Sequence, residues 1–298
     1  MDRKMLIIAN LHSGKRKIRN TLSVAVDKFC AAGYIPTVRT TQARNDAEKI
    51  VAEKSDDYEL VVCCGGDGTL NETISGMMRS NKRVPIGYIP CGSTNDMANT
   101  LDLPRKVDKA AELIINGEPV DHDIGKFGDS RYFTYIASFG AFTRASYATS
   151  QRVKNVLGHA AYLLAGVKEA FRIRANHFKV TYDGQTVEGD FIFGSISNST
   201  SFGGVLSFPE SAVTLNDGVM ELMLIRKPKN PFALFSTINA LLRKKFDNKN
   251  LVFAHTGNVK FESDKELYWT IDGEQSDKIK EVVVDDVPCT VQIMRRKK

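Results

Sequence analysis

The chain has 298 residues, of which 42% are hydrophobic and 26% charged, a balance typical of a globular protein with room for two ordinary domains. It has no run of 18 or more apolar residues, which excludes an evident membrane span. The net charge of +6 suits anionic ligands or an anionic membrane surface, and equally no specific partner; we expect no nucleic-acid ligand. The cysteines form no CxxC pair, which favours reduced thiols in a cytoplasmic protein.

The first 120 residues alternate between short apolar runs and segments with apolar residues at helical spacing. We expect Asn45 to cap the second helix. Strands and helices that alternate at this spacing predict βαβ units and a mostly parallel sheet. In chain order, we expect strands at 4–10, 35–41, 58–66 and 84–92, and helices at 21–33, 45–55, 69–80 and 108–117.

Short strands dominate the rest of the chain, and Asp183-Gly184 is a hairpin-turn signal. We therefore predict two domains: an α/β domain over residues 1–125, to which residues 290–298 could return, and a mainly antiparallel β-domain over 126–289. In chain order, we expect strands within 122–140, 178–199, 218–227, 249–263, 267–275 and 280–296, and helices at 155–173 and 231–246.

Three of the predicted strands end in glycine and small polar residues, in the loops 10–15, 65–69 and 92–96. Ligands of an open α/β sheet bind beyond the carboxyl ends of its strands. Glycine lets backbone N–H groups approach an anion, and a helix N-terminus adds partial positive charge. Each turn alone is more often an ordinary tight turn, but the three together predict a phosphate site. The spacing is neither GxxxxGK[ST] nor GxGxxG.

Two of these loops also carry an aspartate, Asp67 and Asp96. Carboxylates beside a phosphate site indicate a magnesium-bound polyphosphate, because Mg²⁺ takes oxygen ligands and shares them with phosphates. The alternative is that each aspartate caps a helix or forms an Asx turn. The residues alone therefore predict a magnesium–polyphosphate site in an α/β domain.

The segment Gly65-Gly66-Asp67-Gly68-Thr69-Leu70-Asn71-Glu72 resembles the signature of the diacylglycerol kinase catalytic domain, and so does Gly92-Ser93-Thr94-Asn95-Asp96. Similar motifs follow in order as far as "TIDGEQS", so the resemblance runs from Asn10 to Glu274. Sphingosine and ceramide kinases share this domain, and NAD kinases and phosphofructokinases share a related turn. The resemblance implies a Rossmann-like, NAD kinase/phosphofructokinase-like nucleotide-binding domain, a lipid-binding β-sandwich, and the use of ATP and Mg²⁺.

The resemblance also assigns roles to single residues. Asp272 corresponds to the catalytic base that accepts the proton of the lipid hydroxyl, although Asp-Gly is also the strongest short hairpin signal. Nucleotide contacts are implied for Asn10, Ser13, Gly14, Thr40, Gly66, Asp67, Gly68, Thr69, Leu70, Asn71, Glu72 and Ser93.

Metal ligands are implied in a second place. Asp217 corresponds to a structural magnesium ligand, with the carbonyl of Val219, but Thr214 stands where some members have an aspartate, so the completeness of the site stays open. A water-mediated carboxylate network is also implied, and it needs a cation because its members would otherwise repel one another. Its members are Asp67, Asp96, Asp123 and Glu274.

These implications predict a lipid kinase that transfers the γ-phosphate of ATP to a lipid hydroxyl, with diacylglycerol as the first candidate substrate and phosphatidic acid as its product. The lipid itself stays open, because monoacylglycerol, phosphatidylglycerol, undecaprenol and sphingoid bases also offer a hydroxyl. We expect peripheral contact with the inner face of the membrane, and a homodimer is left open. The segments 160–174 and 231–246 combine apolar and basic residues as an interfacial surface would, although both could be core helices. The alternatives are a soluble-substrate kinase of the NAD kinase type and a non-catalytic nucleotide- or lipid-binding protein of the same fold.

Overall fold

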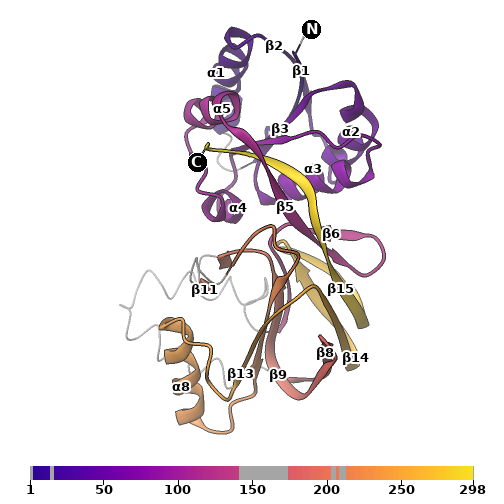
Figure 1. Ribbon diagram of the computed structural model, residues 1–298, viewed down its shortest axis with the longest axis vertical. Coiled ribbons are helices and arrows are strands. Elements are labelled where there is room, and N and C mark those ends of the chain that lie inside the picture. The colour runs from indigo at the N-terminus through magenta and orange to yellow at the C-terminus, as the bar shows by residue number, and fades with distance from the viewer. Residues whose placement is uncertain (1–2, 14–16, 141–173, 203–205, 208–212, 298) are drawn as a thin grey trace.

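The computed structural model describes residues 3–13, 17–140, 174–202, 206–207 and 213–297 (Figure 1). The helix predicted at 155–173 and the predicted nucleotide contact Gly14 lie outside the described residues.

The N-terminal part is a parallel sheet with helices on both faces, as predicted. Its strand order is β2-β1-β3-β4, and every neighbouring pair is parallel. Met5 and Ile7 of β1 pack in the core under α1 and α5, whereas Leu6 and Ile8 pack under α2 and α3. The elements are β1 (Arg3–Ala9), α1 (Lys17–Ala31), β2 (Tyr34–Thr40), α2 (Asp46–Lys54), a 3₁₀ turn (Ser55–Asp57), β3 (Leu60–Gly65), α3 (Asp67–Arg79), β4 (Ile86–Pro90), α4 (Asp96–Thr100) and α5 (Val107–Asn116).

The C-terminal part is mainly antiparallel sheet, which confirms the predicted fold class. Trp269 lies at the centre of its aromatic core, with ring centroids 4.9 Å from Phe139 and from Phe261. The elements are β5 (Glu118–Phe127), β6 (Arg131–Phe133), β7 (Ile136–Gly140), β8 (Asn176–Tyr182), β9 (Gln185–Ser197), β10 (Ser201–Phe202), β11 (Leu206–Ser207), β12 (Met220–Arg226), α8 (Pro231–Leu242), β13 (Leu251–Thr256), β14 (Asn258–Ile271) and β15 (Glu274–Arg295).

Two long strands, β5 and β15, run from one part of the molecule to the other (Figure 1). β15 pairs antiparallel with β14 and β5, and its residue Ile293 pairs in parallel with Ile86 of β4. The end of the chain therefore adds a strand to the N-terminal sheet. This connection also carries the β14–β15 turn to the N-terminal half of α3, where the candidate site lies.

The cap predicted for the second helix is wrong. Asn45 has a left-handed backbone (φ 65°), and its side chain makes no capping hydrogen bond. Instead the Glu72 carboxylate of α3 accepts the N–H groups of Asn45 (2.9 Å) and Ala47 (3.2 Å). The N-terminus of α2 is thus stabilised by a tertiary contact, which local sequence patterns do not reveal.

Candidate active site at the glycine turns and the β14–β15 hairpin

The glycine turn after β3 lies against the glycine loop after β4. A Cβ atom added to Gly92 would be 2.6 Å from the Cα atom of Gly66, so the two backbones meet at a distance that only glycine permits. A Cβ atom on Gly68, by contrast, would meet nothing within 4 Å. Gly92 is therefore required by packing, whereas Gly68, in the first turn of α3, leaves its backbone open to a ligand.

Side-chain amides organise the loops around this turn. Asn10 Nδ2 donates to Thr69 Oγ1 (3.1 Å), which ties the loop after β1 to the first turn of α3. Asn95 accepts the N–H of Gly92 (2.9 Å) and donates to its carbonyl (3.0 Å), from a left-handed backbone (φ 53°). The sequence assigned no role to Asn95, although asparagine is the residue most tolerant of that backbone after glycine.

Asp67 and Asp96 lie where the N-termini of α3 and α4 meet. Asp67 is the first residue of α3, and its Oδ1 accepts the N–H of Met97 in the first turn of α4 (3.3 Å). Burial raises the pKa of the Asp67 carboxyl, and the N–H groups of Met97, Asp96 and Asn95 oppose that rise. Asp96 is 3% exposed. Two helix N-termini that point at one place favour bound anions.

Asp272 lies in the two-residue turn between β14 and β15, and its carboxylate is surrounded by donors. Oδ2 accepts the N–H (2.6 Å) and hydroxyl (2.8 Å) of Thr134 and the amide of Asn71 (2.6 Å). Oδ1 accepts the N–H groups of Tyr135 (3.1 Å) and Ile136 (3.0 Å). Burial raises the pKa of the Asp272 carboxyl above its usual value, and these hydrogen bonds oppose the rise.

A cavity of about 240 Å³ brings Asp272 together with Gly68. Arg44 and Arg131 line the same cavity, and both approach the carboxylate of Glu274, at 2.5 and 3.7 Å. The sequence missed these two arginines, which lie outside the glycine motifs. The cavity therefore combines an open helix N-terminus, two guanidinium groups and a buried carboxylate, a set suited to an anionic polyphosphate and a hydroxyl acceptor.

Other predicted nucleotide contacts differ in what they can offer. Leu70 is fully buried in the core, so only its backbone could reach a ligand, and Glu72 caps α2 as described above. Thr40 accepts a hydrogen bond from Gln42 (3.0 Å) at the end of β2. Ser93 is exposed in the loop before α4, and Ser13 donates its N–H to the carbonyl of Asn10 (3.1 Å).

Asp123 lies beside the loop of Asp217. Its Oδ2 accepts the N–H of Gly218 (2.8 Å) and its Oδ1 that of Cys289 (2.5 Å), at an irregularity in the β15–β5 pairing. Burial, together with the charges of Asp123 and Asp217, raises the pKa of Asp286 to about 7. The two oxygens of Asp286 have no hydrogen-bond partner among the described residues. Asp123 and Asp286 therefore lie near Asp217, whereas Asp67 and Asp96 lie at the glycine turns.

Within the described ranges, no group of three or more His, Cys, Asp or Glu side chains is placed to hold a metal ion. In the same part of the chain, no helix combines the length and the apolar character needed to cross a membrane.

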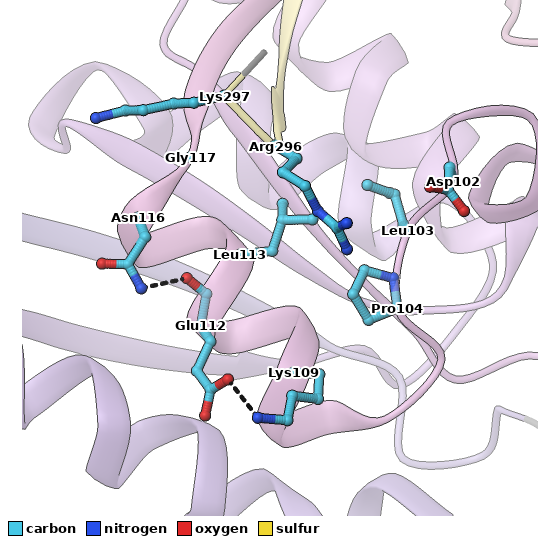
Figure 2. A pocket seen from close by; sticks show the side chains of 10 residues that line it. All are labelled: Asp102, Leu103, Pro104, Lys109, Glu112, Leu113, Asn116, Gly117, Arg296 and Lys297. Carbon is cyan, nitrogen blue, oxygen red and sulfur yellow. Dashed lines mark hydrogen bonds and ion pairs between the residues drawn. The ribbon is translucent and has the colours of Figure 1, made fainter.

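A larger cavity, of about 520 Å³, lies at α5 and the C-terminal residues Arg296 and Lys297 (Figure 2). Two acidic residues, Asp102 and Glu112, line it. Glu112 is paired with Lys109 at 2.8 Å, and hydrogen bonds from Lys109 and Lys28 lower the pKa of Glu112 to about 2. It contains none of the predicted site residues, so the smaller cavity is the candidate active site.

Comparison with known proteins identifies the family. Residues 4–127 match the sequence model described as "Diacylglycerol kinase catalytic domain", and residues 136–295 match that described as "YegS C-terminal NAD kinase beta sandwich-like domain". The diacylglycerol kinase of Bacillus subtilis (strain 168) is 31% identical over 271 residues, which cover 90% of this chain and 88% of that protein. The chain belongs to the diacylglycerol kinase family.

Further relatives extend the match. The diacylglycerol kinase of Staphylococcus carnosus (strain TM300) is 31% identical over 278 residues, covering 92% of this chain and 89% of that one. A crystal structure of a diacylglycerol kinase from Bacillus anthracis str. Sterne has a TM-score of 0.80 at 23% identity and covers 99% of this chain and 97% of that one, which shows the same fold. The family and its named relatives make this chain a kinase, and the expected family is confirmed.

Proposed function

We propose that this kinase transfers the γ-phosphate of ATP to the hydroxyl of a membrane lipid, with diacylglycerol as the first candidate acceptor and phosphatidic acid as the product. The observation that carries the proposal is the cavity that places the Asp272 carboxylate beside the open glycine Gly68 and the guanidinium groups of Arg44 and Arg131. Family membership supports the same reaction class.

The N-terminal loops are suited to the phosphates of ATP. The backbone around Gly68 is open, and Asn10 and Asn95 hold the neighbouring loops in place. Arg44 and Arg131 would neutralise charge on the transferred phosphoryl group, the main task of a protein in this reaction. Arg131 is partly desolvated, and burial lowers its pKa, but its guanidinium remains charged at any physiological pH.

Asp272 is suited to accept the proton of the attacking hydroxyl. The oxygen–phosphorus bond to the lipid would form as the bond to ADP breaks, and the hydroxyl proton would pass to the carboxylate. A carboxylate has about four acceptor positions, and Asp272 already accepts five hydrogen bonds, so a substrate hydroxyl must displace a donor. Asn71 is the donor best able to leave, because its side chain can rotate whereas three of the others are backbone N–H groups.

Mg²⁺ would supply charge neutralisation on the phosphates. Asp67 and Asp96 are the residues of this chain nearest to the phosphate loops that could hold it. A second cation would suit Asp217 and the carbonyl of Val219, because the unpartnered oxygens of Asp286 face the charges of that region. Asp286 thus offers the carboxylate that Thr214 does not. Two carboxylates with carbonyl and water oxygens are an ordinary Mg²⁺ environment.

The test is transfer of labelled γ-phosphate from ATP to a panel of micellar lipids, with NAD as a soluble acceptor. We expect label on a single lipid class and none on NAD. Label on NAD alone would replace the proposal with a soluble-substrate kinase. Binding of ATP without label on any acceptor would contradict the assigned reaction and favour a binding protein of the same fold.

A further inference from the structure

Helix α8 lies at the end of the molecule remote from the N-terminal sheet (Figure 1). Phe232 is 86% exposed and Phe235 is 65% exposed, the two highest values for large hydrophobic residues in the described ranges. On the other side of the helix, Leu234 and Thr237 are buried. Residues three apart lie on one face of a helix, so the two phenylalanines form a single apolar ridge.

Hydrogen bonds hold both the N-terminus and the buried side of the helix, so the exposure of the phenylalanines does not come from fraying of the helix. Asn230 caps it by accepting the N–H of Ala233 (2.8 Å), with Pro231 in the first turn. Thr237 receives a hydrogen bond from the amide of Asn250 (3.1 Å), which attaches the buried side to the chain before β13. An ordered helix that exposes two neighbouring phenylalanines to solvent is typical of a surface that binds an apolar partner.

The positive charge of the protein is concentrated around this ridge. Seven of the 41 Lys and Arg residues of the chain, but one of its 35 Asp and Glu residues, lie in residues 226–249. The remaining residues carry 34 charges of each sign, so this segment accounts for the whole net charge of +6. Six of its basic side chains are exposed: Lys227, Lys229, Arg243, Lys244, Lys245 and Lys249.

Helix stability explains only half of this pattern. Arg243, Lys244 and Lys245 follow the C-terminus of α8, where positive charge is favourable to the helix dipole. Lys227 and Lys229 precede the N-terminus, where positive charge is unfavourable. Basic residues at both ends of an apolar ridge indicate an anionic, extended partner rather than an internal stabilising role.

We propose that α8 and its flanking basic residues dock the protein on an anionic membrane surface, with Phe232 and Phe235 entering the headgroup region. Exposed aromatic residues beside a basic cluster have the chemistry of interfacial membrane binding. The proposal rests on the proposed function in that docking would bring the enzyme to a lipid substrate, but vesicle binding is measured independently of catalysis.

The experiment is co-sedimentation of the full chain with vesicles of phosphatidylglycerol and phosphatidylcholine, and with phosphatidylcholine vesicles alone. The variants are F232S/F235S and K244E/K245E. Their matched controls lie on β14 and β15: Y268S removes another exposed aromatic side chain, and K265E/K280E changes the net charge equally. Thermal unfolding of every variant checks that the fold is kept.

We expect wild type to bind the anionic vesicles in a salt-sensitive way. F232S/F235S should weaken binding at least about tenfold, because each phenylalanine loses burial in the membrane. K244E/K245E should weaken it by at least about twentyfold, at about fivefold for each basic charge near an anionic surface. The controls should bind as wild type does.

Wild type that stays in solution with anionic vesicles would overturn the proposal, and so would α8 variants that bind like wild type or controls that lose binding equally. Phosphorylation of dispersed dioctanoylglycerol separates docking from catalysis. Variants that lose vesicle binding but still phosphorylate it support docking as a separate step. Vesicle binding by a wild type that phosphorylates no lipid would keep the docking surface and reject the proposed reaction.

Discussion

The substitution Asp272→Asn removes the negative charge of the hairpin carboxylate and almost nothing of its shape. The new amide has one acceptor oxygen and one donor nitrogen, so one of the two positions now occupied by carboxylate oxygens must hold an NH₂ group. At the Oδ1 position that group would face the N–H groups of Tyr135 and Ile136, which cannot reorient. At the Oδ2 position the Thr134 hydroxyl can rotate to accept, and the Asn71 amide can do so by giving up its hydrogen bond to the Tyr132 carbonyl (3.2 Å). The Thr134 N–H is the one donor there that loses its partner.

The amide should therefore place its nitrogen at the Oδ2 position, at the cost of one unsatisfied backbone N–H. Such a group costs about 1–3 kcal/mol, and in a chain of this size each kcal/mol lowers the unfolding midpoint by about 2–4 °C. The protein should remain folded, with a reduced midpoint. Loss of a general base lowers kcat by about 10²- to 10⁴-fold. Activity should thus fall far more than stability.

The assay is kcat for transfer of labelled phosphate to the preferred lipid, measured beside the unfolding midpoint. Asp183→Asn is the matched control, because Asp183-Gly184 forms the same kind of hairpin turn with a left-handed aspartate (φ 46°), exposed and remote from the cavity. It should leave kcat unchanged. A kcat of Asp272→Asn within about threefold of wild type would refute the role of Asp272 as general base, since loss of a base lowers kcat far more than that.

Three further outcomes are expected. Gly68→Val should weaken ATP binding at least about tenfold while the free energy of unfolding changes by less than about 1 kcal/mol, because its Cβ meets open space; equal loss of both would make the turn structural. Burial lowers the pKa of His122 to about 4, so the imidazole takes up a proton below about pH 6.5 in the unfolded chain but not in the folded one. The free energy of unfolding should therefore fall by about 3 kcal/mol as the pH drops from there to about 4. His122→Asn should reduce this pH dependence, measured by urea unfolding, and the half-buried control His177→Asn should not. Mg²⁺ should raise the thermal midpoint of wild type but not of Asp217→Asn, and an unchanged response in that variant would remove Asp217 from the cation site.

The sequence predicted those parts of the fold that are encoded locally. The alternation of apolar runs and helical patterns is enough for a parallel sheet with helices on both faces, since β1 must bury residues on each side. The glycine turns could be recognised because Gly92 approaches the backbone of Gly66 too closely for a Cβ atom. Asp183-Gly184 was predicted to be a hairpin turn, and for Asp272-Gly273 the hairpin turn was the alternative to a catalytic role; both pairs form hairpin turns.

What the sequence did not predict depends on contacts between distant segments. Asn71 and Asp272 are separated by 201 positions, and no spacing rule connects them. Arg44 and Arg131 are ordinary surface arginines in sequence terms, and only the folded chain brings them to one cavity. The capping prediction for α2 was wrong for the same reason, because the carboxylate that accepts the N–H groups there belongs to Glu72 of another helix.

The Asp272-Gly273 pair can be a hairpin turn and also supply the proposed catalytic base. The left-handed backbone of Asp272 (φ 47°) and of Gly273 (φ 82°) is what a two-residue hairpin requires. The same turn directs the carboxylate at three successive backbone N–H groups, from Thr134 after β6 to Ile136 at the start of β7, which hold it in a buried position. Asp183 occupies an equivalent turn, but it is exposed and its partner is the Thr256 hydroxyl. The turn signal therefore specifies where the chain reverses, whereas the strands opposite the turn decide whether its aspartate can act as a base.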